Sequence, residues 1–310
     1  MLPNFRFSVS LLLSALLLPV VGQAANLKVN CGGSSEDALP TINSAIRLLN
    51  PEALNTVTVS GSCHENILIQ GFDRLTLITT TGATINDASG GRSPVVDIED
   101  SRRVNLEGFT IRGGASGVNC SNASVCSLTG NTVETAQQGV GSFAGSKLFL
   151  YGNTIQNNSQ QAVVVAHDSR VGSEYDTFKG SGDVGVFAIS GASFITIGSI
   201  IQNNGSDGIV VTDHSTARLI SVTISGNAGN GVTLENAGEA RFDSDAGAST
   251  VTANGGSGVS VRDLSFGFFS AGTSITGNLG GTDVVCAPQF SATRGALTNI
   301  GGGKTNCVEP

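Results

Sequence analysis

The stretch Gly231-Val-Thr-Leu-Glu-Asn-Ala-Gly-Glu-Ala-Arg-Phe242 decides the fold of this 310-residue chain. Apolar and polar residues alternate on both sides of a short turn, so that Val232 and Leu234 share one face before it and Ala240 and Phe242 share one face after it. Alternation with a period of two predicts half-buried β-strands. These strands are too short to pair as a hairpin, so their backbone groups need partners from elsewhere in the chain.

The same pattern repeats along the chain with a period of 22 to 23 residues. A glycine followed by Val or Ile recurs at Gly117, Gly139, Gly185, Gly208, Gly231 and Gly258, with Ala162-Val163 in the one gap. A second apolar column keeps step with it: Ile111, Val133, Ile155, Phe178, Ile201, Ile224, Val251 and Ile275. Both columns lengthen together near Asp243–Ser249, where we expect an insertion. Such a period predicts a solenoid in which each coil of three short strands contacts only its neighbours.

Short polar residues form a third column, just before the third strand of successive coils. They are Asn131, Asn153, Asp176 and Ser199. Side chains of this kind tolerate left-handed backbone and hydrogen-bond to nearby main chain. We therefore interpret the column as a structural ladder between stacked turns, and we do not interpret these residues as ligands.

Two segments make the pattern more specific: Gly152-Asn-Thr-Ile-Gln-Asn-Asn158 and Ile201-Gln-Asn-Asn-Gly-Ser-Asp-Gly-Ile209. They resemble the repeats of the pectate-lyase-like superfamily, and the resemblance covers roughly residues 57–285. It implies an all-β fold, a right-handed single-stranded parallel β-helix of about ten coils. It matches no specific enzyme family, because the Asp-Pro-His-Asp motif of alginate epimerases and the Gly-His-Gly and Arg-Ile-Lys motifs of polygalacturonases are missing.

The two ends of the chain read differently from the repeats. Residues 1–24 resemble a secretory signal peptide, with Arg6 before an apolar run at 10–21 and small residues before a cleavage point after Ala24. We expect a secreted, periplasmic or cell-surface protein with no membrane span; the alternative is an anchor that is never cut. Residues 25–56 should form an N-terminal cap with a helix over 40–50, residues 57–285 the β-helix, and residues 286–310 a C-terminal capping tail.

Six cysteines behind a signal peptide indicate disulfides. Pairing of near neighbours predicts Cys31–Cys63, Cys120–Cys126 and Cys286–Cys307, although the spacing leaves other pairings open. The net charge of the chain restricts the classes of molecule that it is expected to bind. The net charge is −8, which disfavours nucleic acid and anionic membranes and leaves an extracellular protein or a polysaccharide.

The resemblance implies that a ligand site lies on the outward face of the first strand of several coils. In this chain the middle of that face is apolar, with Phe143, Val164, Phe187, Ile189 and Val210 facing outward. We predict that these five residues bind a ligand or partner, or are covered by the tail of the protein itself. The alternative is a register shifted by one residue, which would turn them into the core.

Charged residues lie at both ends of the face. At the first end, Asp97, Glu99 and Asp100 are candidate calcium ligands, and Arg102 and Arg103 are candidate bases of the lyase type. No cofactor other than calcium is suggested.

At the second end, His214 and Glu235 are candidates for acid–base work. The alternative at both ends is an ordinary solvated edge with polar turns.

Two functions remain open on this basis. The first is a non-catalytic secreted or surface β-helix that serves as a scaffold for a partner or polysaccharide. The second is a lyase or epimerase that acts on an acidic polysaccharide, either with or without a requirement for calcium.

Overall fold

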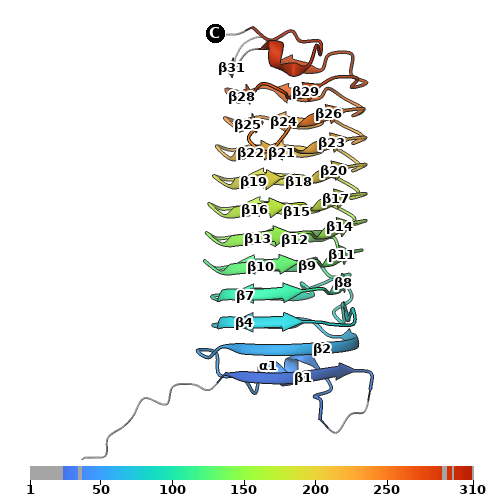
Figure 1. Cartoon of the computed structure of the whole chain (residues 1–310), viewed down its shortest axis with the longest axis vertical. Helices are drawn as coiled ribbons and strands as arrows, with labels where there is room; N and C mark the ends of the chain where they lie inside the picture. The colour runs from blue at the N-terminus through green and yellow to red at the C-terminus, as the bar shows by residue number, and fades with distance from the viewer. Residues whose placement is uncertain (1–23, 34–36, 288–291, 295–296, 309–310) are drawn as a thin grey trace, which may run out of the picture.

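The protein is a rod of stacked coils, seen in a computed structural model that describes residues 24–33, 37–287, 292–294 and 297–308 (Figure 1). The expected all-β parallel β-helix is confirmed. Strands paired in parallel follow one another from the N-terminal to the C-terminal end of the rod. The segment interpreted as a signal peptide lies outside the described residues, apart from Ala24. Within the described residues, no helix is long and apolar enough to cross a membrane.

Each full coil contributes one strand to each of three stacks, which we call sheets 1, 2 and 3. Sheet 1 contains β3 (Ile67–Gln70), β6 (Val96–Glu99), β9 (Ser116–Ser121), β12 (Gln138–Ser142), β15 (Val163–Ala166), β18 (Val186–Ile189), β21 (Ile209–Val211), β24 (Val232–Leu234), β27 (Val259–Val261) and β30 (Val284–Cys286). Sheet 2 contains β1 (Ala25–Cys31), β2 (Asn55–His64), β4 (Asp73–Ile78), β7 (Arg102–Glu107), β10 (Val125–Thr129), β13 (Lys147–Tyr151), β16 (Arg170–Glu174), β19 (Ser193–Ile197), β22 (Thr216–Ile220), β25 (Glu239–Asp243), β28 (Phe266–Phe269) and β31 (Ala292–Arg294).

Sheet 3 begins with the last residues of β2, which bends from sheet 2 into sheet 3. It continues with β5 (Thr84–Asn86), β8 (Thr110–Arg112), β11 (Thr132–Glu134), β14 (Thr154–Gln156), β17 (Thr177–Lys179), β20 (Ile200–Gln202), β23 (Thr223–Ser225), β26 (Thr250–Thr252) and β29 (Ser274–Ile275).

The register matches the one read from the sequence. Val140, Val163, Val186, Ile209 and Val232 pair in order along sheet 1 and are fully buried. The alternative of a register shifted by one residue is therefore wrong. The predicted insertion is also present, because two residues lie between the paired positions Ile220 and Thr223, and six lie between their partners Asp243 and Thr250.

The predicted polar ladder forms at the turns between sheets 2 and 3. The Oδ1 atom of Asn153 accepts from the Asn131 amide at 2.9 Å, and Asp176 Oδ1 accepts from the Asn153 amide at 2.6 Å. Ser199 Oγ then accepts from the Asp176 amide at 3.1 Å. Each side chain thus gives a buried amide of the preceding coil an acceptor, which keeps the turns paired.

Two further ladders were not predicted. One, before sheet 2, consists of serine hydroxyls that accept from amides one coil back, at Ser101, Ser124, Ser146, Ser169, Ser215 and Ser265. The other, after sheet 3, consists of asparagine amides at Asn158, Asn204, Asn227, Asn254 and Asn278. All three kinds of turn are therefore tied from coil to coil by short polar side chains.

The N-terminal end departs from expectation in two ways. Strand β1 pairs with β2 over seven residues, so residues 25–31 are the first strand of sheet 2. The helix α1 spans only Ile42–Ile46 and not residues 40–50. After α1, the amides of Leu48 and Leu49 donate to carbonyls three residues back, as in a 3₁₀ turn.

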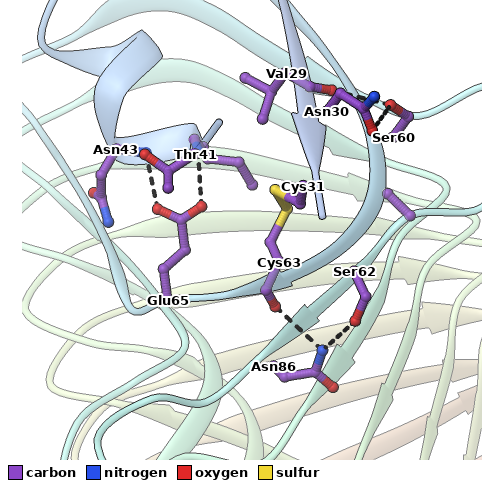
Figure 2. Close-up of a disulfide and its surroundings, with 12 residues drawn as sticks. Val29, Asn30, Cys31, Thr41, Asn43, Ser60, Ser62, Cys63, Glu65 and Asn86 are labelled. Atoms are coloured by element: carbon purple, nitrogen blue, oxygen red, sulfur yellow. Dashed lines mark hydrogen bonds between the residues drawn. A yellow bond between two sulfur atoms is a disulfide. The ribbon is translucent and has the colours of Figure 1, made fainter. Parts of the chain in front are cut away.

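All three predicted disulfides are formed. Cys31–Cys63 joins β1 to β2 (Figure 2), Cys120–Cys126 spans the turn between β9 and β10, and Cys286–Cys307 holds the C-terminal segment against β30. That segment includes the 3₁₀ helix η1 (Leu297–Ile300), whose Ile300 is buried on the last coil.

Candidate functional site

The outward face of sheet 1 holds the residues that the sequence placed there. Pairing runs from Asp97 through Asn119, Gly141, Val164, Phe187, Val210 and Thr233 to Ser260. Neighbouring strands of a sheet lie about 4.8 Å apart, so these side chains form one continuous row along the rod.

We call Phe143, Val164, Phe187, Ile189 and Val210 the apolar strip. Val164 and Val210 are only 6% and 8% exposed, and the other three residues are half-buried. The Phe143 ring lies over Gly141, where a Cβ would come within 2.2 Å of the ring. The strip is thus flat, and its two valines are shielded by their neighbours.

The strip has no high walls, because the turns that lead into sheet 1 are short. From β14 to β27, six residues separate each strand of sheet 3 from the next strand of sheet 1. Glycines let these turns stack closely: a Cβ on Gly182 would lie 2.4 Å from the Ser159 carbonyl oxygen, and one on Gly205 would lie 2.3 Å from the Gly182 carbonyl oxygen. A ligand on this face would therefore meet a flat surface.

A longer connection, residues 87–95, stands at the N-terminal end of the face. Its conformation depends on Asp87, whose carboxylate accepts from the amides of Ser89 and Gly91 and from Asn66 Nδ2. Partial burial alone would raise the pKa of Asp87, but these hydrogen bonds hold it well below its ordinary value. Gln137, two coils further on, donates to the Gly91 carbonyl at 3.0 Å and fixes the connection against the rod.

The acidic end of the face contains Asp97 and Glu99 on β6. Burial, and then the neighbouring charge of Glu99, raises the pKa of Asp97 to about 6. Asp97 and Glu99 do not form, with Asp100, a group whose ligand atoms all lie within 4.8 Å of one another. The one such group among the described residues is Cys31, Cys63 and Glu65, whose cysteines are joined in a disulfide. Calcium binding at Asp97, Glu99 and Asp100 stays a prediction.

The structure does not place Arg102 and Arg103 beside these carboxylates. Both arginines lie beyond the next turn on β7, in sheet 2, whereas Asp97 and Glu99 are in sheet 1. Arg103 instead pairs with Asp73, with its Nε 2.9 Å from Oδ1. Among the described residues, no ion pair within 4.0 Å joins either arginine to Asp97, Glu99 or Asp100, and a role for the arginines as bases stays a prediction.

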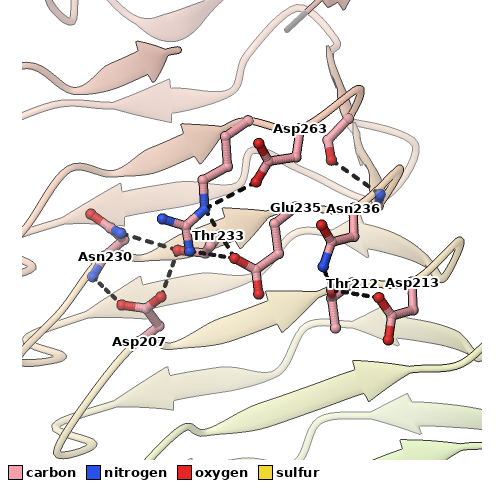
Figure 3. Close-up of polar contacts among 11 residues, drawn as sticks. Asp207, Thr212, Asp213, Asn230, Thr233, Glu235, Asn236 and Asp263 are labelled. Atoms are coloured by element: carbon pink, nitrogen blue, oxygen red, sulfur yellow. Dashed lines mark hydrogen bonds and ion pairs between the residues drawn. The ribbon is translucent and has the colours of Figure 1, made fainter. Parts of the chain in front are cut away.

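At the second end of the face, the two candidate acid–base residues, Glu235 and His214, have different contacts. Glu235 accepts from Arg262 Nε at 2.9 Å and is held in an ion pair across adjacent coils (Figure 3). His214 is exposed and lines a shallow hollow of about 410 Å³ with Asp213, Asn236 and Asp263. In the described part of the chain, the His214 ring makes no hydrogen bond to a carboxylate.

Comparison with known proteins identifies the family. The family model of the right handed beta helix region matches residues 44–204 and 94–246. The chain belongs to the right-handed β-helix family. Comparison with curated protein sequences finds no match for this right-handed β-helix protein.

Solved structures share its fold at low sequence identity. It is similar to the pectate lyase Pel9A, with 10% identity and a TM-score of 0.56 over 84% of this chain and 79% of that one. It is also similar to the A-module of the Azotobacter vinelandii mannuronan C-5 epimerase AlgE4, with 11% identity and a TM-score of 0.56 over 93% and 90% of the two chains. The periplasmic alginate epimerase AlgG gives 13% identity and a TM-score of 0.54 over 89% and 85%.

One polar cluster of the right-handed β-helix protein was missed by sequence reasoning. Asp207 accepts from the Asn230 amide at 2.6 Å and from the Thr233 hydroxyl at 2.5 Å, and Asn230 Nδ2 also reaches Thr233 at 3.0 Å (Figure 3). Asp207 and Asn230 each precede the repeated glycine in successive coils, and that shared position was the signal. The cluster fastens the turn to sheet 1 beside the apolar strip.

Proposed function

We propose that this right-handed β-helix protein is an exported, non-catalytic scaffold that binds another protein through the apolar strip on sheet 1. One observation carries the proposal: the middle of the outward face is apolar over five side chains in consecutive coils. An apolar surface of this kind that faces outward is typical of an interaction site.

The ionisable residues at the ends of the face support a non-catalytic role. General acid–base catalysis needs a group that is free to exchange a proton within hydrogen-bond reach of the substrate. Glu235 is held in an ion pair by Arg262, so its carboxylate is not free in this way. The arginines predicted as bases lie on another sheet.

A protein suits the apolar strip better than a sugar chain does. Sugar hydroxyls lose their hydrogen bonds to water on binding and need polar partners in return. The strip supplies methyl groups and aromatic rings, which match the apolar centre of a protein interface. Export is supported by the three disulfides, since such bonds persist in oxidising environments outside the cytosol.

Site-specific crosslinking in the native host tests the proposal. A photoreactive phenylalanine analogue in place of Phe187 should capture one defined protein, and the same analogue in place of Phe149 on sheet 2 should not. The captured protein, once purified, should bind the Phe187→Asp/Ile189→Ser variant at least about tenfold more weakly than wild type. Unchanged affinity of that variant, with the fold retained by circular dichroism, would overturn the proposal.

The lyase or epimerase function is the second candidate, favoured by the raised pKa of Asp97 next to Glu99. It predicts ultraviolet-absorbing unsaturated product, or altered uronate stereochemistry, from polygalacturonate or alginate in the presence of calcium. It also predicts that Asp97→Asn removes this activity. A scaffold should form neither product from either polymer, whether calcium is present or absent.

A further inference from the structure

A different surface, the outward face of sheet 2, concentrates exposed aromatic rings. Phe149 and Tyr151 on β13 are 51% and 54% exposed, and Tyr175, directly after β16, is 61% exposed. The two tyrosines are the only ones in the chain, and their rings meet edge to face with centroids 6.0 Å apart. Exposing three aromatic side chains in adjacent coils forfeits the burial that stabilises such residues elsewhere.

A glycine lets the Phe149 ring lie against the sheet. Gly172 pairs with Phe149 in the next coil, and a Cβ at that glycine would contact the ring at 3.5 Å. The ring is therefore supported on one side and open to solvent on the other. An open aromatic face of this kind can pack against the C–H face of a sugar ring.

Cations form a row on sheet 2 two residues before Phe149, whereas Tyr151 and Tyr175 lie toward the opposite strand ends, where Tyr151 pairs with Glu174. Arg102, Lys147 and Arg170 all begin strands of sheet 2; Lys147 and Arg170 pair directly, and Val125 stands between Lys147 and Arg102. All three are exposed, and none has a carboxylate oxygen within 4.0 Å among the described residues. Like charges directly opposite each other on neighbouring strands are destabilising. Asp73 of β4 pairs directly with Arg102, whereas Glu107 and Glu174 lie at the opposite strand ends, about 13 Å from Lys147 and Arg170.

A groove of about 380 Å³ continues the row toward the N-terminal end. Its lining is mostly apolar, with Leu54, Val125 and Phe149 among the residues that form it. Thr76, Asn105 and Ser127 also line it and occupy one column of outward positions. Arg74 and Arg103 also line it and share the single carboxylate of Asp73. The groove therefore combines hydroxyl and amide groups with a local excess of positive charge, and Phe149 closes one end.

We infer that the outward face of sheet 2 binds an acidic polysaccharide that runs along the axis of the rod. The cations suit the carboxylates of uronic acids, the hydroxyl and amide groups in the groove suit sugar hydroxyls, and Phe149 suits a sugar ring face. Coils recur about every 4.8 Å, close to the length that one pyranose ring adds to a glycan chain, so an extended chain stays in step with the coils. Nucleic acid carries a denser charge that this face, on a protein of net charge −8, matches poorly.

The test compares two double charge reversals of equal size. Binding of polygalacturonate and alginate hexamers is measured by calorimetry at low salt with the full chain. Lys147→Glu/Arg170→Glu should lose at least about tenfold in affinity, since charged hydrogen bonds contribute more than neutral ones. Phe149→Ala should weaken binding as well. Arg92→Glu/Lys179→Glu, which lies off sheet 2, should bind like wild type, and rising salt should weaken every complex.

Each other outcome contradicts the inference. Wild-type protein that binds neither hexamer would refute it, as would Lys147→Glu/Arg170→Glu protein with unchanged affinity. Tighter binding of a single-stranded oligonucleotide than of either hexamer would assign the face to nucleic acid instead. Sheet 1 variants such as Phe187→Asp should not affect hexamer binding, so this result and the fate of the proposed protein interface are separable.

Discussion

At the scale of single residues, Glu65 shows how one buried carboxylate closes the N-terminal end. It follows β2, is 8% exposed, and accepts from the amides of Ile42 and Asn43 at 2.7 and 2.9 Å, at the start of α1 (Figure 2). The first amides of a helix have no partner within the helix, and negative charge there is favourable. Glu65 thus fastens α1 to the coil that it covers.

Replacing Glu65 with Gln should destabilise the protein by about 1–3 kcal/mol, because the amide group presents a donor where two donors need an acceptor. Urea unfolding followed by circular dichroism measures the change. Glu52→Gln, an exposed carboxylate in the same end segment, is the matched control and should change stability little. Equal effects of the two substitutions would show that Glu65 does not hold the cap.

Asp97 gives the outward face of sheet 1 a pH dependence. Its pKa is raised from an ordinary 3.8 to about 6, first by burial and then by Glu99. The folded state therefore holds this proton more tightly than the unfolded state, so stability contributed by the group falls as pH rises from about 4 to 6 and stays lost above that.

Asp97→Asn should therefore stabilise the protein at pH 7.5, on the order of 1 kcal/mol after allowance for solvent screening, and should change little at pH 4. Thermal unfolding at both pH values measures the difference. Glu99→Gln is a second variant that relieves the same repulsion, so it should give a smaller gain with the same pH dependence. A destabilised Asp97→Asn protein at pH 7.5 would contradict this account of the site.

At the scale of elements, the stacked turns depend on polar ladders as much as on apolar packing. Asn227 is representative: its Oδ1 accepts from the Asn204 amide at 3.1 Å and from Asn204 Nδ2 at 2.9 Å, and its Nδ2 donates to Asn254 Oδ1 at 2.9 Å. All three asparagines are nearly fully buried. Removing the Asn227 side chain takes the acceptor from two donors of Asn204 and leaves Asn254 Oδ1 with the Asn227 backbone amide alone.

Asn227→Ala should therefore cost about 2–3 kcal/mol, more than a typical single hydrogen bond, because several buried polar groups lose their partners together. Chemical unfolding measures the cost. Gln202→Ala, at an outward position of neighbouring β20, controls for the loss of an amide side chain and should stay close to wild type. A similar loss for both variants would argue that the ladder is not a specific source of stability.

At the scale of the whole molecule, the rod resists unfolding from its ends because disulfides join the terminal segments to the coils. A solenoid gains stability from neighbour contacts, so its end coils are the weakest. Cys31–Cys63 closes a loop with a sequence separation of 32, whereas Cys120–Cys126 closes one of 6. Loop-closure entropy predicts about 3.7 kcal/mol for the first and about 2.2 kcal/mol for the second.

Cys31→Ala/Cys63→Ala should accordingly destabilise the protein more than Cys120→Ala/Cys126→Ala. Amide hydrogen exchange should show the extra loss of protection in β1 and β2, with the middle coils unaffected. Uniform loss of protection along the rod after removal of Cys31–Cys63 would instead mean that the solenoid unfolds as a single unit.

The sequence alone determined the period, the inward column that includes Val163 and Val186, the ladder from Asn131 to Ser199 and the three disulfides. These features follow from residues one coil apart, and stacking brings residues 22 to 23 apart into contact whatever the details of the turns. Only the tertiary structure decided on which sheet Arg102 and Arg103 lie. The turn at Asp100, with a φ of 49°, sends Arg102 and Arg103 onto sheet 2, away from Asp97. The tertiary structure also set Glu65 against α1, because the direction of a turn and the meeting of a cap with a coil depend on backbone geometry that apolar periodicity does not encode.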